Sequence, residues 1–269
     1  MSASLGPVDN LGTDAAMRVA VLGWGAIGRT VGTALAQGRV TGARLCAVAN
    51  RRLATDCPVP VVEAERLADG ADLVVEAAGQ QALATNGEAY LRSGCRLLVV
   101  SVGALVDEDL FQRLRRAGGN RLYLATGALG GLDLLRAARR AGPLDEVTLT
   151  TTKQPSSLMQ DWMDPAMTTA LRAGRDEVVV FDGPAAEAVR RFPQSVNVAA
   201  TLALTAGSWE VVRVRVVADP DVGINRHDIE IAGAAGRYRF TVENRPSDDN
   251  PKTSGIVPHA VLQGVASLC

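Results

Sequence analysis

Short apolar runs alternate with amphipathic segments along the first half of the chain. The runs are typical of strands buried on both faces, and they lie at 17–22, 43–49, 71–79, 96–104 and 121–127. The segments 27–37, 82–93 and 107–117 between them have the spacing of helices. Strands and helices that alternate in this way predict a parallel sheet joined by crossover helices.

The pattern changes near residue 145, where β-branched and alternating segments replace the continuous apolar runs. We expect strands at 146–152, 176–181, 211–218, 227–232 and 237–242, and helices at 184–191 and 199–205. In the segment 211–218 the valines share one face and the two arginines lie opposite. Such alternation predicts an antiparallel sheet with helices, and hence a second, α+β domain.

These patterns predict an α/β protein with two domains. Residues 1–16 lack Lys, Arg and a long apolar stretch, so we expect a flexible extension and not a secretory signal. The first domain would comprise residues 17–140, with 253–269 returning to it as a helix. Residues 141–252 would form the α+β domain.

Composition excludes several classes of protein. The chain of 269 residues is 47% hydrophobic with a net charge of -1, which gives no electrostatic footprint for nucleic acid. It has no run of about 18 apolar residues, so we expect no membrane span. The four cysteines show no C-x-x-C spacing. We expect reduced thiols in a cytoplasmic protein and no metal site.

A glycine motif follows the first apolar run directly. Gly23-Trp24-Gly25-Ala26-Ile27-Gly28 has the form G-x-G-x-x-G between a strand and a helix. Gly23 would make the tight turn, Gly25 would admit a pyrophosphate, and Gly28 would let helix and strand pack closely. Helix N–H groups and a partial positive charge would then face the phosphates. The motif predicts nucleotide binding, and the alternative is a purely structural glycine turn.

The residues after the second strand bear on which dinucleotide binds. An NAD-specific fold usually carries Asp or Glu there, to bond the ribose 2′-hydroxyl. This chain has Asn50, Arg51 and Arg52, and guanidinium groups bind phosphate with paired donors. We therefore expect NADP to be accepted beside or in preference to NAD. Alternatively, the two arginines are only solvated loop charges.

Small residues dominate three strand ends that a parallel sheet would bring to one edge. They are 76–79, which includes Ala78, then 101–104 and 126–131, which includes Ala128. Ligands of open α/β sheets bind beyond the carboxyl ends of the strands. We expect these ends to leave room for a flat ring, although each could be an ordinary short turn.

Two histidines are present, and His227 is the candidate for proton transfer. It is in phase with Ile229 and Ile231, on the apolar face of a predicted strand. That position suits either a core histidine or a general base at the mouth of an interdomain cleft. His259, in the last helix, is expected to be structural.

Two further segments carry polar candidates. Residues 248–254 look like a loop that leads into a helix, with Thr253 or Ser254 as cap and Lys252 beside an anion-binding N-terminus. Asn197 precedes an apolar helix, where its amide could cap that helix or contact a ligand.

Taken together, these motifs resemble the L-aspartate dehydrogenases. The similarity runs from about residue 18 to the C-terminus, and it rests on the segments 23–28, 127–133, 192–200, 225–227 and 243–254. Lys153-Gln154-Pro155 departs from the Lys-Pro-Pro often found in that family.

The resemblance implies a fold, an assembly and an activity. The fold would be a Rossmann dinucleotide-binding domain with a smaller catalytic and dimerisation domain, usually as a homodimer. The activity would be oxidative deamination of L-aspartate with NAD or NADP, giving iminoaspartate, then oxaloacetate and ammonia. Iminoaspartate that escapes hydrolysis could feed NAD synthesis.

The resemblance also assigns residues to roles. It places the active-site base on His227 and dinucleotide contacts on Ala128 and Asn197. Candidate substrate contacts are Asn225, Lys252, Thr253 and Ser254. Two alternatives remain at this stage. One is a homoserine dehydrogenase-like or dihydrodipicolinate reductase-like enzyme, and the other is a non-catalytic NADPH-binding sensor.

Overall fold

The structure is a computed structural model that describes residues 16–52, 55–193 and 197–269. Within this part, the side chains of Pro251 and Lys252 are not described. The predicted N-terminal extension therefore lies outside the described residues, except for Ala16.

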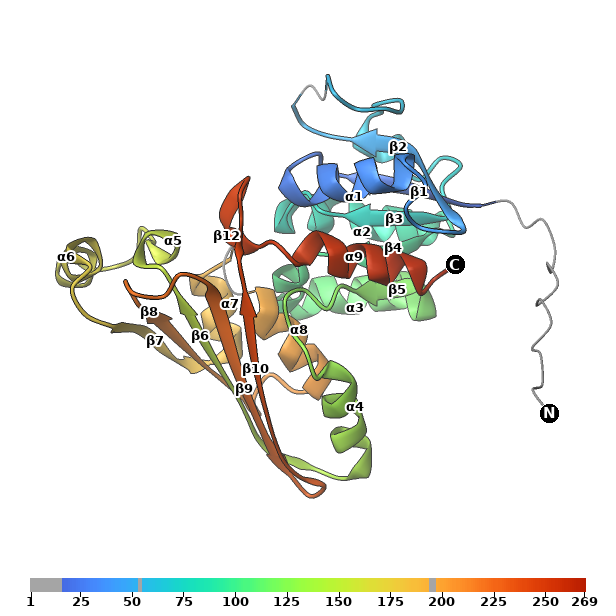
Figure 1. The fold of residues 1–269 in the computed structure, drawn as a ribbon. Helices are drawn as coiled ribbons and strands as arrows, with labels where there is room; N and C mark the ends of the chain where they lie inside the picture. The colour runs from blue at the N-terminus through green and yellow to red at the C-terminus, as the bar shows by residue number, and fades with distance from the viewer. Residues whose placement is uncertain (1–15, 53–54, 194–196) are drawn as a thin grey trace, which may run out of the picture.

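The N-terminal half forms the predicted parallel sheet (Figure 1). Its strand order is β2-β1-β3-β4-β5, and every described pairing in it is parallel. The strands are β1 (Met17–Leu22), β2 (Ala43–Ala49), β3 (Leu73–Glu76), β4 (Arg96–Val99) and β5 (Leu122–Leu124). Because the carboxyl ends of parallel strands meet at one edge, the glycine motif after β1 lies beside the ends of β3 and β4.

Helices cover both faces of this sheet. They are α1 (Ala26–Ala36), α2 (Gln80–Arg92), α3 (Glu108–Gly118) and α9 (Val257–Ala266), with short 3₁₀ turns at Ala64–Arg66, Val102–Val106 and Gly119–Arg121. Helix α9 packs against α1, and its Val261 and Val265 are buried beside β1. Helices α2 and α3 pack together over the other face. Alternate β1 residues therefore enter two separate apolar layers.

The second sheet is mixed, which corrects the expected antiparallel sheet. Its order is β10-β9-β6-β8-β7, and β6 runs parallel to β8. Its strands are β6 (Leu144–Lys153), β7 (Val178–Pro184), β8 (Val212–Ala218), β9 (Asn225–Gly233) and β10 (Gly236–Asn244). Alternation shows which face of a strand is buried but not its direction, and the long connection from β6 to β8 permits a parallel neighbour.

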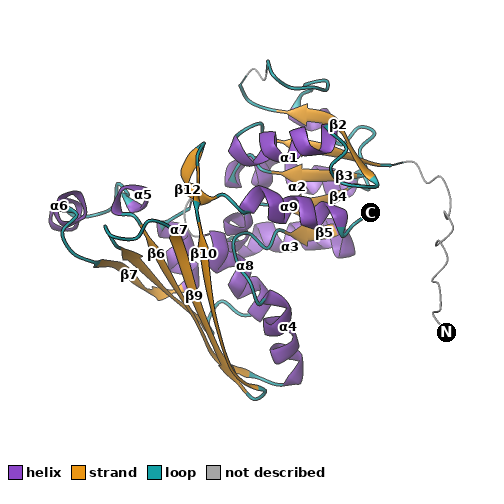
Figure 2. Ribbon diagram, viewed as in Figure 1, coloured by secondary structure: helices purple, strands orange, loops and turns teal. Residues whose placement is uncertain are grey.

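Helices lie on one face of the second sheet (Figure 2). They are α7 (Ala185–Arg191) and α8 (Asn197–Ala206), which contact the turn after β4 of the first sheet, and α4 (Leu132–Ala141), which packs on α8 and β9. The opposite face carries charged pairs, such as Arg213 with Asp182 at 2.8 Å and Arg226 with Asp228 at 2.8 Å.

Three described helices and two described strands were absent from the sequence prediction. They are α4, α5 (Pro155–Leu158), α6 (Pro165–Ala173), and the hairpin of β11 (Pro246–Ser247) with β12 (Asn250–Ser254). The hairpin overturns one expectation. Thr253 and Ser254 lie in β12 and cap no helix, because α9 begins only at Val257, after Ile256.

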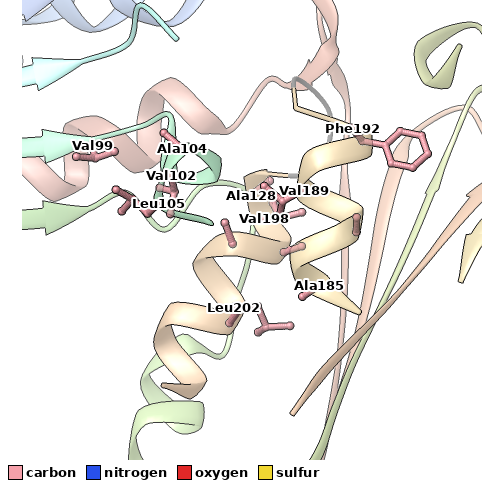
Figure 3. Close-up of a cluster of buried hydrophobic side chains, with 14 of the residues drawn as sticks. Val99, Val102, Ala104, Leu105, Ala128, Ala185, Val189, Phe192, Val198 and Leu202 are labelled. Atoms are coloured by element: carbon pink, nitrogen blue, oxygen red, sulfur yellow. The ribbon is translucent and has the colours of Figure 1, made fainter. Parts of the chain in front are cut away.

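Buried side chains connect the two sheets (Figure 3). Val102, Ala104 and Leu105 of the turn after β4 belong to the same apolar cluster as Val198 and Leu202 of α8. That cluster continues through α7 to Val214 and Val216 of β8. A continuous core of this kind holds the strand ends of the first sheet against the helices of the second.

No helix in the described part of the chain is long and apolar enough to cross a membrane.

Candidate active site

The glycine loop has the shape that a dinucleotide pyrophosphate requires. Gly23 has a φ of 98°, and a Cβ there would lie 2.7 Å from the Ala77 carbonyl oxygen. A Cβ on Gly28 would collide with the carbonyl oxygen of Gly23. At Gly25, by contrast, a Cβ would meet no atom within 4 Å, so the backbone is open to a ligand.

The helix that follows is ready to face an anion. Helix α1 begins at Ala26 with Gly25 as its N-cap, without a side-chain cap and without an acidic residue in its first turn. Its first N–H groups and the positive end of its dipole therefore point toward the open space above Gly25. The residues present thus fit the phosphates of a nicotinamide dinucleotide.

A cavity of about 530 Å³ lies beside this loop. Its lining includes Gly23, Gly25, Asn50, Arg51, Arg52 and Ala78, together with Glu63 and Glu65. The Asn50 Oδ1 accepts a hydrogen bond from the Trp24 backbone N–H at 3.1 Å, and its Nδ2 donates to the Arg52 carbonyl at 2.8 Å. The Asn50 side chain is thus used to hold the turn, whereas Arg51 and Arg52 are exposed at the cavity.

A buried carboxylate organises two of the strand ends, and sequence reasoning missed it. Glu76 is fully buried, and it accepts hydrogen bonds from the N–H groups of Ala78 at 2.9 Å and Gly79 at 3.0 Å. It also accepts bonds from the backbone and the hydroxyl of Ser101. Burial raises the pKa of Glu76, and these hydrogen bonds oppose that rise. The sequence did contain a sign of this role, because Glu76 is a charged residue at the end of an apolar strand.

A second, smaller cavity of about 80 Å³ lies between the two sheets. It is lined by Ile27, Val100, Ala125, Gly127, Ala128, Lys153, Asn197, Val198, Thr201, His227, Thr253, Ser254 and Val257. The structure thereby brings together six residues that the sequence singled out, from opposite ends of the chain. We refer to this space as the interdomain cavity.

Two of the predicted dinucleotide contacts also hold the domains together. The Asn197 Oδ1 accepts a hydrogen bond from the Gly103 N–H at 3.1 Å, and the Ala128 carbonyl accepts one from Asn244 Nδ2 at 3.3 Å. Asn225 does not line the interdomain cavity, but its Nδ2 donates to Ser254 Oγ at 3.3 Å. The predicted role of the Lys252 side chain lies outside the described residues.

His227 is an almost completely buried histidine. It is 1% exposed, and its Nδ1 lies 3.1 Å from the hydroxyl of Thr151, its partner on the neighbouring strand. Burial, reinforced by the charge of Lys153, lowers the pKa of His227 to about 3, and Asp228 opposes this shift. The imidazole is therefore neutral near pH 7.

Lys153 is the second titratable side chain of the interdomain cavity. It ends β6, is 3% exposed, and has a pKa that burial lowers to about 8. Sequence reasoning treated this residue only as part of a departure from a family motif. A signal was available, because the chain has 28 lysines and arginines, of which only Lys153 and Lys252 are lysines.

Comparisons with known proteins agree with this arrangement. Residues 133–268 match the family model described as "Aspartate dehydrogenase, C-terminal". L-aspartate dehydrogenase of Methanosarcina mazei is 35% identical over 263 residues, which cover 94% of this chain and 96% of the relative. The chain belongs to the L-aspartate dehydrogenase family. Another member, L-aspartate dehydrogenase 2 of Bordetella pertussis, is 38% identical over 254 residues, 91% of this chain and 94% of the relative.

Membership of the L-aspartate dehydrogenase family also accounts for the fold. The crystal structure of aspartate dehydrogenase from Thermotoga maritima matches with a TM-score of 0.71 and 27% identity, over 94% of this chain and 96% of that chain. Residues 23–123 match the family model "Homoserine dehydrogenase, NAD binding domain". The likeness to homoserine dehydrogenase is therefore limited to the N-terminal half, which is an NAD(P)-binding domain.

Proposed function

We propose that the protein oxidises L-aspartate with NAD(P), giving iminoaspartate and then oxaloacetate and ammonia. The observation that carries this proposal is the interdomain cavity. Its lining includes the buried His227 together with Asn197, Ala128 and Ile27 from the first turn of α1. Homology to L-aspartate dehydrogenases over nearly the whole chain supports the choice of substrate.

When bound, the dinucleotide would accept the hydride from the substrate Cα. The protein's own groups would bind the cofactor, leave room for its ring and transfer a proton. The glycine loop would hold the pyrophosphate, and the small side chains of Ala125 and Ala128 would leave room for the flat ring. His227 would take a proton from the water that attacks the imine carbon. Its low pKa in the free enzyme would rise when a dicarboxylate enters, because two negative charges nearby favour the charged form of the imidazole.

We propose the domain boundaries expected from the sequence, 17–140 with 253–269 and then 141–252. The packing of α9 on α1 supports the return of the C-terminus to the first domain. We also propose a homodimer that forms through the charged face of the second sheet, which α7 and α8 leave uncovered. Light scattering on the purified protein tests this, since a monomer at micromolar concentration would contradict it.

NADP is proposed as an accepted cofactor, beside NAD or in preference to it. Asn50 cannot repel a 2′-phosphate as a carboxylate would, and Arg51 and Arg52 border the same cavity. Glu63 and Glu65 also border that cavity, and a carboxylate close to the 2′-phosphate would oppose binding of NADP.

A substrate panel tests the reaction. The protein is mixed with NAD or NADP and with L-aspartate, D-aspartate, L-homoserine or L-glutamate, and reduced cofactor is measured by absorbance. The proposal predicts turnover with L-aspartate far above the rest. Turnover with homoserine alone would favour a homoserine dehydrogenase-like enzyme. Cofactor binding without any turnover would favour a sensor.

A further inference from the structure

Lysine is rare in this chain, and its positions are informative. Of 28 lysines and arginines, all but Lys153 and Lys252 are arginines. Wherever a charge on the surface suffices, this sequence uses Arg. Lys252 lies in the β12 hairpin strand, whose next two residues line the interdomain cavity, and Lys153 lines that cavity itself. Both lysines are therefore near the proposed site of chemistry.

Lys153 is held at a fixed place in the interdomain cavity. It is the last residue of β6 and pairs with Ala218 of β8, so the sheet fixes its backbone. Its side chain is 3% exposed, although lysine is rarely buried to that extent. Burial costs the charged form free energy, which a position with only a structural role would avoid by using an apolar residue.

A cation that merely binds a substrate carboxylate would favour arginine. Guanidinium bonds a carboxylate with two parallel donors, but it cannot lose its proton in a protein. An amine can lose its proton, and burial is the condition that makes it do so. The use of lysine at this one buried position therefore indicates a group that changes its protonation state.

We propose that Lys153 is a catalytic base, which takes a proton from the α-ammonium group of the amino-acid substrate before the Cα–H bond breaks. This inference rests on the proposed function. In this step one N–H bond of the substrate ammonium breaks and one N–H bond forms on Nζ, so a neutral substrate amine and a lysine ammonium result. Nothing is oxidised in it. The nitrogen lone pair thus freed can form the C=N bond as hydride leaves Cα.

The charged groups around Lys153 agree with this role. Among the described side chains that line the interdomain cavity, His227 on β9 is the other titratable group, and those from α1, α8 and α9 are uncharged. The side chain of Lys252 on β12 is not described. Asp228 acts on His227 from the same strand. Burial lowers the pKa of Lys153 to about 8, so this amine loses its proton more readily than a lysine in water.

The scarcity of lysine makes a direct measurement possible. Protein labelled with ¹³C and ¹⁵N only in lysine would give two side-chain signals in an NMR spectrum, and Lys252→Arg would assign them. We expect Lys153 to titrate near pH 8, well below the ordinary pKa of lysine of 10.5. Titration near pH 10 would overturn the proposal.

Kinetics of two matched variants give the second readout. Lys153→Arg keeps a positive charge and Lys153→Met keeps the length of the side chain without charge. A base contributes about 10²–10⁴-fold, so kcat should fall at least about 100-fold in both, while binding of reduced cofactor and thermal stability stay close to wild type. The rise of wild-type kcat with pH near 8 should disappear in both.

The outcomes separate the two proposals. If Lys153→Arg retains kcat within about threefold of wild type, a cation is sufficient and the base is elsewhere. If the wild type itself fails to oxidise aspartate, the proposed function fails. The role of Lys153 then fails too, because the α-ammonium group of aspartate is the proton donor in the proposed step.

Discussion

At the scale of the residue, burial is what gives the candidate site its chemistry. His227 and Lys153 are 1% and 3% exposed, and burial pushes both pKa values down. The His227 imidazole is thus neutral near pH 7, and the Lys153 amine loses its proton at a lower pH than a lysine in water. Glu76 is the opposite case, because four hydrogen bonds from Ala78, Gly79 and Ser101 occupy its carboxylate and leave it a structural role.

The low pKa of His227 predicts a specific loss of stability in acid. The folded-state pKa of about 3 lies below the ordinary 6.5, so the unfolded chain binds the extra proton more readily. Stability from this group is present above pH 6.5 and is lost as the pH falls toward 3, by up to about 1.4 kcal/mol per pH unit. Thermal melts between pH 7 and pH 5 should show wild type losing more stability than His227→Gln, and parallel losses would contradict this.

At the scale of the element, we propose that the turn after β2 determines the choice between NAD and NADP. The amide of Asn50 is bonded to the backbone on both sides, so the two following arginines are the groups that can meet a 2′-phosphate. Hydrogen bonds to charged groups contribute roughly 1.5–3 kcal/mol.

Substitution of these arginines should therefore change selectivity and leave the fold intact. In Arg51→Ala/Arg52→Ala, the Kd for NADPH should rise about 10-fold or more while the Kd for NADH changes little. Asn50→Asp is the matched variant, since it keeps an acceptor for the Trp24 N–H and adds repulsion toward the phosphate. Fluorescence titration measures both. If the Kd values for NADPH and NADH rise by the same factor, the arginines do not bind the 2′-phosphate.

Sequence patterns predicted most elements of the first domain and fewer of the second. Continuous apolar runs mark strands buried on both faces, and all five strands of the first sheet lie where expected. The direction of β6 relative to β8 depends on the path of the chain through space, which alternation does not encode. The hairpin that carries Thr253 and Ser254 was mistaken for a helix start, because its residues suit both a cap and a turn.

At the scale of the whole molecule, one continuous apolar core holds the two sheets together. Leu105 is fully buried in the turn after β4, in the same cluster as Val198 and Leu202 of α8. Helix α8 also carries Asn197, whose side chain bonds Gly103. The interdomain cavity therefore exists only when both halves are folded. Some residues of this cavity could be identified from sequence motifs. The position of Lys153 beside His227 could not, because it depends on how β6 and β9 fold together.

Weakening this core should destabilise the molecule as one unit. Leu105→Ala leaves a cavity and should lower the free energy of unfolding by about 2–5 kcal/mol. Because the core is shared, denaturation should stay a single transition that both fluorescence and circular dichroism follow. Two separated transitions in the variant would mean that the domains fold independently.

The central claim is that His227 performs chemistry in the interdomain cavity and does not merely fill it. The most direct test compares wild type with His227→Ala, measuring NADPH binding and L-aspartate oxidation on the same preparations. We expect turnover to fall about 10²–10⁴-fold while the Kd for NADPH stays within about twofold. Near-normal turnover in the variant would contradict the account, because the base that activates the attacking water would then have to be another group.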